Sequence, residues 1–192
     1  MKTVCVYCAS SSKAAPIYLK SAIDLGEVLT KNNLDVVYGG GSTGLMGALA
    51  DSVLENKGTI TGVLPDFMEE LEWGHKKVNM ISVGDMHERK RIMLEMADAV
   101  VALAGGCGTF EEILEAITWR RLGLFKGPAI IVNTNHYYDP IIAQLNRAVD
   151  ENFMNDEHRK LWIVVSSTEE LMVALQDPTE NENSLANAAV AQ

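Results

Sequence analysis

LDVVYGGGSTGLMG, residues 34–47, combines an apolar run, a glycine-rich turn and the beginning of an amphipathic stretch. The run at 34–38 predicts a buried strand, and a helix is predicted to begin at Gly44. Glycines permit positive φ and let the backbone approach a ligand closely. The start of a helix adds unpaired N–H groups and the positive end of its dipole. This segment therefore predicts a strand-to-helix turn that binds phosphate, and a tight turn without a ligand is the alternative.

The same order recurs at residues 99–114, AVVALAGGCGTFEEIL. An apolar strand is followed by a glycine-rich turn at 104–109 and then by a second helix. A single glycine-rich turn can be an ordinary loop. Two such turns at the ends of strands in one small sheet are harder to explain in that way. A third turn, at 9–12, has no glycine but three serines, and we expect hydroxyls such as that of Ser10 to replace some of the backbone donors.

Short apolar runs rich in Val and Ile alternate with amphipathic stretches along the chain. Strands are predicted at 3–8, 34–38, 59–64, 78–83, 99–103, 128–132 and 162–165. Helices are predicted at 17–31, 44–56, 85–97, 109–123, 139–155 and 168–176. Low charge in the strands indicates burial on both faces of a sheet. The alternation predicts an α/β fold with a doubly wound, Rossmann-like and mostly parallel sheet of about seven strands, with helices on both faces.

We expect one domain over residues 1–176, followed by a polar, alanine-rich tail at 177–192. In an open parallel sheet, ligands bind beyond the carboxyl ends of the strands. Both glycine turns are predicted at that edge. The fold class therefore indicates a single ligand site that contains both turns.

Composition excludes several classes of partner. Twenty-six acidic residues against 16 lysines and arginines give a net charge of −10, which predicts no binding to nucleic acid or to anionic membranes. We expect neither a signal peptide nor a membrane span, because no apolar run reaches roughly 18 residues. Cys5, Cys8 and Cys107 form no disulfide framework, which favours the cytoplasm. Cys5 and Cys8 have C-x-x-C spacing, but they fall in a predicted strand and are interpreted as packing residues.

Charged residues near the second turn allow two interpretations. Thr109 and Glu112 have the spacing of a capping box, in which Glu112 merely caps its helix. The basic cluster at 87–91 either forms a solvated helix face or lies beside a bound anion. The second interpretation explains why cations stand near a helix N-terminus, where they oppose the helix dipole. Histidines show no ligand spacing, and no metal is predicted.

Two segments together carry a family resemblance: AGGCGTFEE, residues 104–112, and MHERK, residues 86–90. They resemble the P-G-G-x-G-T-x-x-E and M-H-x-R-K motifs of the LOG family of cytokinin riboside 5′-monophosphate phosphoribohydrolases, proteins often mislabelled as lysine decarboxylases. The turn at 39–47 also looks like the first glycine turn of that family. The likeness covers roughly residues 3–165. Ala104 replaces the proline of the motif, and residues 64–75 match the base-side loop only loosely.

The resemblance implies hydrolysis of the N-glycosidic bond of a nucleoside 5′-monophosphate, such as AMP or N6-prenyl-AMP, to a free base and ribose 5-phosphate, without a cofactor. Glu112 and Arg89 would be catalytic. Glu112, kept ionised by the helix dipole, would orient water and the ribose hydroxyls, and Arg89 would orient the nucleotide or stabilise the departing base. A homodimer or higher homo-oligomer is also implied, with Arg89 and the helix at 109–123 near the shared face. The implied substrate-binding residues are Ser10, Gly40, Gly41, Ser42, Glu72, Met86, Lys90, Gly105, Gly106, Cys107, Gly108, Thr109 and Glu111.

Three other functions compete with this one. A non-catalytic carrier of a nucleotide or of molybdenum cofactor would keep the phosphate turns but would not need the pair of Arg89 and Glu112. An NAD-dependent enzyme would use Asp66, which follows Gly44 at about the spacing of a ribose-binding acid. It would leave the second glycine turn unexplained. A pyridoxal-phosphate-dependent lysine decarboxylase would need a lysine that forms a Schiff base with the cofactor. No lysine of this sequence lies in a convincing context for that role.

Overall fold

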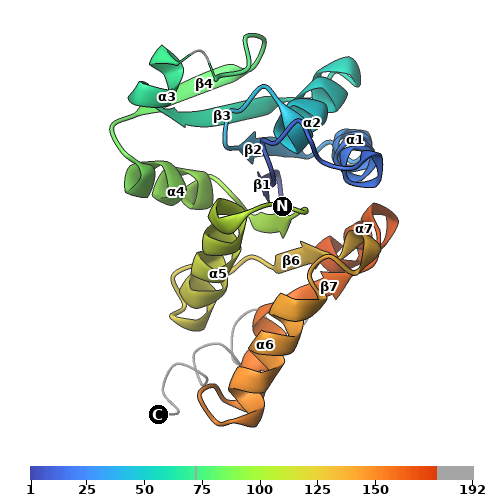
Figure 1. Ribbon diagram of the computed structural model, residues 1–192, viewed down its shortest axis with the longest axis vertical. Helices are drawn as coiled ribbons and strands as arrows, with labels where there is room; N and C mark the ends of the chain where they lie inside the picture. Colours follow the sequence, from blue (N-terminus) through green and yellow to red (C-terminus); the bar gives the residue numbers. More distant parts are fainter. Residues whose placement is uncertain (72, 177–192) are drawn as a thin grey trace.

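The computed structural model describes residues 1–71 and 73–176, and its strands form one seven-stranded sheet (Figure 1). The strands are β1 Thr3–Tyr7, β2 Asp35–Tyr38, β3 Ile60–Pro65, β4 Asn79–Val83, β5 Ala99–Ala102, β6 Ala129–Val132 and β7 Ile163–Val165. They lie in the order β4-β3-β2-β1-β5-β6-β7, and every neighbouring pair is parallel. The predicted doubly wound parallel sheet is confirmed. The predicted tail, 177–192, lies outside the described residues.

The helices follow the predicted pattern, with differences at their ends. The long helices are α1 Pro16–Lys31, α2 Gly44–Glu55, α4 Met86–Glu95, α5 Cys107–Arg121, α6 Asp139–Asp150 and α7 Thr168–Gln176. Three short elements were not predicted: α3 Asp66–Glu70 and the 3-10 helices η1 Thr134–His136 and η2 Asp156–Leu161. Helix α6 ends earlier than predicted, and Asn152 just beyond it has a left-handed φ of 63°. None of the helices within the described ranges is long and apolar enough to cross a membrane.

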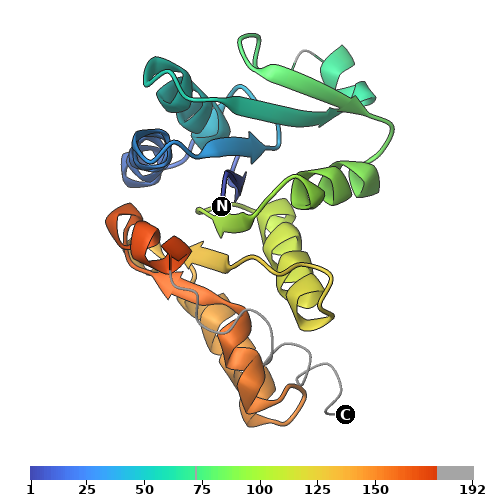
Figure 2. The same ribbon diagram turned by 180° about the vertical axis from the view of Figure 1, so that it is seen from behind.

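Helices cover both faces of the sheet (Figures 1 and 2). Along β1, Val4 and Val6 belong to the core beneath α1, α2 and α7, whereas Cys5 and Tyr7 belong to the core beneath α4, α5 and α6. This alternation is why a strand with almost no polar residue is stable at the centre of the sheet. Cys5 is a buried free cysteine, as is Cys8, so the packing interpretation of both is confirmed.

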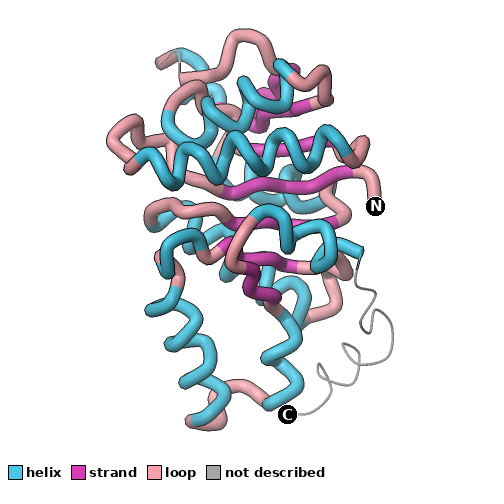
Figure 3. Tube along the Cα trace, turned by 90° about the vertical axis from the view of Figure 1, so that its right-hand side faces the viewer, coloured by secondary structure: helices cyan, strands magenta, loops and turns pink. Residues whose placement is uncertain are grey.

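The central strands bring three loops to one edge of the sheet. Val4 of β1 pairs with Val36 of β2 on one side and with Ala99 of β5 on the other, so these parallel strands end side by side. In Figure 3 the N-terminus marks the beginning of β1, and the carboxyl ends lie at the opposite side of the sheet. The strand order reverses direction between β1 and β5, which is where this class of fold binds its ligands.

Candidate active site

The loop after β1 is hydrogen-bonded to both glycine turns and to the start of α2. Ala9 donates its N–H to the carbonyl of Ala104 at 3.1 Å, and its own carbonyl accepts the N–H of Met46 at 3.2 Å. The hydroxyl of Thr43 also donates to the carbonyl of Ser10 at 2.7 Å. The three turns therefore form one hydrogen-bonded unit at the edge of the sheet, where both glycine turns are predicted.

The first glycine turn, 39–44, is shaped by positive φ and close packing. Gly40 and Gly44 have φ of 79° and 62°. A Cβ atom on Gly44 would lie 2.6 Å from the backbone of Ser10, so only glycine fits there. The N–H of Ser42 donates to the carbonyl of Trp73 at 3.1 Å, so this backbone donor of the turn is already used within the protein. Gly41 forms an antiparallel bridge with Gly74, so the segment after α3 lies along this turn.

The second glycine turn leads into α5, which begins two residues earlier than predicted. Gly106 is its N-cap, and no side chain caps the helix. Glu112 is therefore the sixth residue of α5, too far inside for a capping box with Thr109, so that interpretation is wrong. A Cβ atom on Gly105 would collide with the buried side chain of Thr109. A Cβ atom on Gly106 or Gly108 would meet no atom within 4 Å, so the turn borders open space at these two glycines.

Arg89 links three elements from a buried position on α4. Its Nε donates to the carbonyl of Val63, within β3, at 3.0 Å, and Nη2 donates to the carbonyl of Gly39 at 3.1 Å. Nη1 lies 3.5 Å from Oε1 of Glu112. A side chain at Gly39 would collide with the guanidinium. Arg89 thus connects β3, the first glycine turn and α5.

Glu112 is buried, with 6% of its surface exposed. Burial raises the pKa of its carboxyl group to about 7, and the opposing effect of the Arg89 charge is smaller. The prediction that the helix dipole keeps Glu112 ionised is therefore wrong, because the residue lies beyond the first turn of α5 and desolvation dominates. A carboxyl group with a pKa near neutrality exchanges protons readily, which is the property of a general acid or base.

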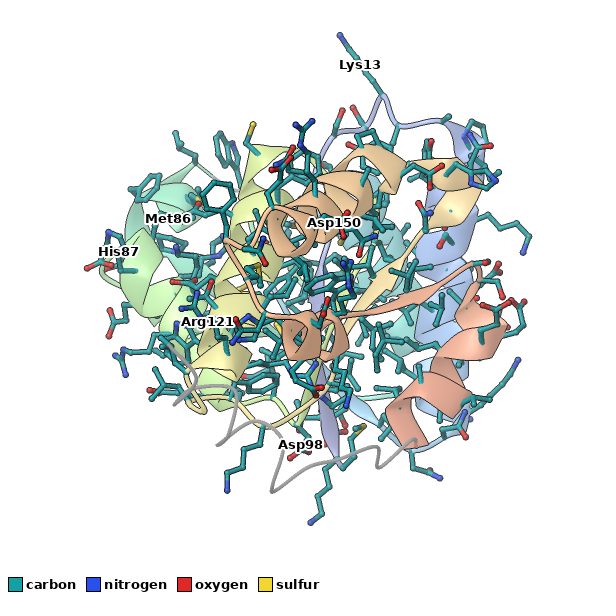
Figure 4. All side chains as sticks on the ribbon, turned by 90° about the horizontal axis from the view of Figure 1, so that it is seen from below. Lys13, Met86, His87, Asp98, Arg121 and Asp150 are labelled. Atoms are coloured by element: carbon teal, nitrogen blue, oxygen red, sulfur yellow. The ribbon has the colours of Figure 1, made fainter. Side chains whose placement is uncertain are left out.

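The other cations of α4 are not all exposed to solvent, as the interpretation of a solvated helix face requires. Lys90 is buried, and its Nζ contacts Oε1 of Glu111 at 2.7 Å and Oε2 of Glu115 at 3.3 Å. These ion pairs join α4 to α5. Asp85 caps α4 by accepting the N–H groups of the next turn, an anion at the helix start that sequence reasoning did not identify. Met86 is half-buried at the outer beginning of this helix (Figure 4).

A pocket of about 440 Å³ opens beside the first glycine turn. Its polar side is formed by the first turn together with Ser10 and Arg89, and its apolar side by the end of β3, α2, α3 and the segment after α3. The lining residues are Ser10, Gly39, Gly41, Ser42, Thr43, Met46, Leu64, Met68, Trp73 and Arg89. The second glycine turn does not line this pocket, and Glu112 contacts it through Arg89. Across the residues that the structure describes, no cluster of His, Cys, Asp and Glu is arranged to hold a metal.

Two aromatic residues at the site were missed by sequence reasoning. Trp73 lines the pocket although the loop that carries it was the weakest part of the family resemblance. Tyr137 follows η1 and donates its hydroxyl to the carbonyl of Gly105 at 2.5 Å. In the sequence, the only signal for the contact between Tyr137 and Gly105 was the pair of consecutive tyrosines at 137 and 138. Glu72, predicted to bind substrate, lies outside the described residues.

The fold and the glycine turns at its switch point define a Rossmann-like α/β protein. Solved structures share this architecture. The molybdenum cofactor binding protein from Rippkaea orientalis superposes with a TM-score of 0.70 at 21% identity, covering 90% of this chain and 94% of that one. The molybdenum cofactor carrier protein of Chlamydomonas reinhardtii gives 0.66 at 21% identity, with the same shares covered. At such identity the likeness concerns the fold alone.

Sequence comparisons give the family. The family model described as "possible lysine decarboxylase" matches residues 46–175. The chain is 38% identical over 177 residues to cytokinin riboside 5′-monophosphate phosphoribohydrolase LOG7 of Arabidopsis thaliana, covering 92% of this chain and 82% of that protein. It is also 38% identical to the LOG enzyme of Oryza sativa subsp. japonica, covering 92% and 73%. The chain belongs to the LOG family.

Proposed function

We propose that this protein is a phosphoribohydrolase that cleaves the N-glycosidic bond of nucleoside 5′-monophosphates, such as AMP or N6-prenyl-AMP, to the free base and ribose 5-phosphate. The observation that carries the proposal is the buried contact between Arg89, which lines the pocket, and Glu112 of α5. The relatives named for this reaction support it, since they match over 92% of the chain.

Glu112 is the acid–base group in this proposal. Cleavage passes through a sugar with oxocarbenium character, which needs nearby negative charge and an activated water. The oxygen of water bonds to C1′ as the bond between C1′ and the base nitrogen breaks, and the bonding electron pair leaves with the base. Glu112 takes a proton from the water and, once protonated, delivers that proton to the departing base, which returns Glu112 to its carboxylate form. A pKa of about 7 suits both transfers.

The second glycine turn and the start of α5 hold the 5′-phosphate, because their glycines leave open space beside an uncapped helix N-terminus. The residues proposed there are Gly105, Gly106, Cys107, Gly108 and Thr109. The first turn and the loop after β1 contribute polar groups along the same edge. These are Ser10, Gly40, Gly41 and Ser42. Met86, Lys90, Glu111 and Glu72 complete the proposed substrate-binding set.

The apolar side of the pocket is the proposed place of the base. Leu64, Met68 and Trp73 form a surface on which a flat heterocycle packs, and Arg89 borders it. The base therefore lies toward β3 and α3, and the phosphate toward β5 and α5. Arg89, between them, is positioned to orient the nucleotide or to stabilise the departing base.

A homodimer in the cytoplasm is the proposed state of the protein. Leu122 and Leu124, at the end of α5, are exposed apolar residues of the kind that a second copy covers. Trp119 in the same helix is half-buried. The free cysteines at positions 5, 8 and 107 suit a reducing compartment.

The competing proposal is a carrier of a nucleotide or of molybdenum cofactor. It draws on the shared fold, but a carrier has no use for a buried carboxyl group with a neutral pKa. Incubation with AMP followed by chromatography separates the two. Release of adenine and ribose 5-phosphate in equal amounts is expected from the hydrolase. Tight binding of AMP without release would contradict the proposal.

A further inference from the structure

Three consecutive carbonyl groups, from Leu103 just before the second glycine turn to Gly105 within it, are held by donors from other parts of the chain. The carbonyl of Leu103 accepts the hydroxyl of Tyr138 at 2.6 Å, and that of Ala104 accepts the N–H of Ala9 at 3.1 Å. The carbonyl of Gly105 accepts the hydroxyl of Tyr137 at 2.5 Å. Carbonyl oxygens repel anions, so fixing them on protein donors removes an obstacle to phosphate binding.

The last of these bonds controls the direction of an N–H group. In a trans peptide, the carbonyl of one residue and the N–H of the next point in opposite directions. A carbonyl of Gly105 held by Tyr137 therefore directs the N–H of Gly106 to the other side of the turn. Gly106 is the N-cap of α5, and a Cβ atom built on it would meet no atom within 4 Å. The helix start at Gly106 therefore borders open space.

The peptide between Gly105 and Gly106 needs such a restraint more than most. Neither residue has a side chain, so rotation of this peptide unit meets little steric resistance. The equivalent peptide in a loop with larger residues would be held by its own Cβ atoms. Here the hydroxyl of Tyr137 supplies the restraint from outside the turn.

Tyr137 is itself held in place. Its ring makes edge contacts with Tyr18 and Tyr138, with ring centres 5.6 and 5.2 Å apart, and it also contacts Phe110. The two residues before it, Asn135 and His136, both have positive φ, at 53° and 59°. Two consecutive non-glycine residues in the left-handed region are unfavourable, and such strain persists where the surrounding structure enforces it.

We propose that Tyr137 is a positioning residue: its hydroxyl holds the Gly105–Gly106 peptide so that the N–H of Gly106 binds a phosphate oxygen of the substrate. The inference rests on the proposed function, which assigns the phosphate to this turn. Tyr137 acts on the ligand through the backbone and touches no reacting atom. Its loss therefore affects recognition of the phosphate rather than the chemical step.

Tyr137→Phe tests this inference, because the substitution keeps the ring and removes only the hydroxyl. We expect KM for AMP to rise about tenfold, the effect of losing one hydrogen bond to a charged group, with kcat within about twofold of wild type. The dissociation constant of ribose 5-phosphate, measured by calorimetry, rises by the same factor. The affinity for adenosine, which has no phosphate, stays unchanged.

Tyr18→Phe is the matched control, since Tyr18 belongs to the same aromatic cluster and, among the described residues, bonds to no carbonyl of the turn. It is expected to retain wild-type KM and wild-type affinity for ribose 5-phosphate.

Wild-type constants in Tyr137→Phe would overturn the inference, as would an equal loss of affinity for adenosine. If the wild-type protein binds ribose 5-phosphate but releases no base from AMP, the proposed function fails while the calorimetric comparison still decides the role of Tyr137. If it binds no phosphate ester, the inference is overturned as well.

Discussion

Nη1 of Arg89 and Oε1 of Glu112 lie 3.5 Å apart, and both side chains are buried. The same guanidinium donates to two backbone carbonyls, of Val63 and Gly39, at 3.0 and 3.1 Å. Its charge is therefore shared among three acceptors, and the contact with Glu112 is the longest. This geometry explains why the pKa of Glu112 remains at about 7 beside a permanent cation.

Glu112→Gln is expected to lower kcat for base release by about 10²- to 10⁴-fold, because the amide is too weak a base to take a proton from water. Binding of AMP stays within about tenfold, or 1.4 kcal/mol, since the shape of the side chain is kept. Glu115→Gln is the control on the same helix, and its kcat is expected to remain close to that of wild type. Full activity of Glu112→Gln would remove Glu112 from the mechanism.

Activity is expected to rise with pH between about 6 and 8, as Glu112 loses its proton and becomes the base that activates water. The measurement is the pH profile of kcat/KM for AMP. A profile that is flat across this range would show that Glu112 does not set the rate.

Folding stability has the opposite dependence on pH. The pKa of Glu112 is raised from 4.5 to about 7 in the folded protein, so the unfolded chain releases this proton first. Between those values the folded state binds more protons, and the free energy of unfolding falls as pH rises, by about 3 kcal/mol from this group. Denaturant unfolding at pH 5 and pH 8 measures the difference. Glu112→Gln is expected to lose this component of the pH dependence, and an unchanged dependence would contradict the assignment.

The neighbouring glycines of the second turn are expected to respond differently to alanine. Gly105→Ala places a methyl group against the side chain of Thr109 and lowers the free energy of unfolding by about 1–3 kcal/mol. Gly106→Ala meets no protein atom, so its stability remains near that of wild type, while KM for AMP rises because the methyl group occupies the space of the phosphate. Unfolding curves and steady-state kinetics of both variants test this pair. Equal KM values for Gly106→Ala and wild type would place the phosphate elsewhere.

Trp73→Ala is expected to raise KM for AMP about tenfold through loss of the apolar surface beneath the base. The backbone bonds of Trp73 to Ser42 and Met68 are kept, so the turn retains its shape. Affinity for ribose 5-phosphate, measured by calorimetry, remains that of wild type. Phe67→Ala, an exposed aromatic outside the pocket lining, is the control. A loss of affinity for ribose 5-phosphate in Trp73→Ala would contradict a role confined to the base.

The strands were predictable because burial on both faces demands apolar runs, and all seven differ from their predicted bounds by only a residue or so. The start of α5 was not predictable from the sequence. Gly106, Cys107 and Gly108, which precede Thr109, are poor helix formers. The ionisation of Glu112 was predicted wrongly because position in a helix is visible in the sequence, whereas burial depends on Arg89, β1 and α4 packing around it.

The contributions of Trp73 and Tyr137 depend on tertiary contacts that no local pattern encodes. Trp73 reaches the site because the bridge between Gly41 and Gly74 brings its segment against the first turn. Tyr137 reaches it from η1, whose left-handed residues Asn135 and His136 have no glycine to mark the bend. Short elements with unusual backbone angles leave little periodicity to detect.

The backbone hydrogen bonds from the loop after β1 to Ala104 and to Met46, at the start of α2, are both made by the peptide groups of Ala9. They use no side-chain atom, so a substitution at position 9 that fits against the core removes neither of them. Proline is the exception, because it has no N–H to donate to Ala104. A side chain at position 9 that differs between two proteins of this fold therefore says nothing about whether these bonds are present, because the backbone alone makes them.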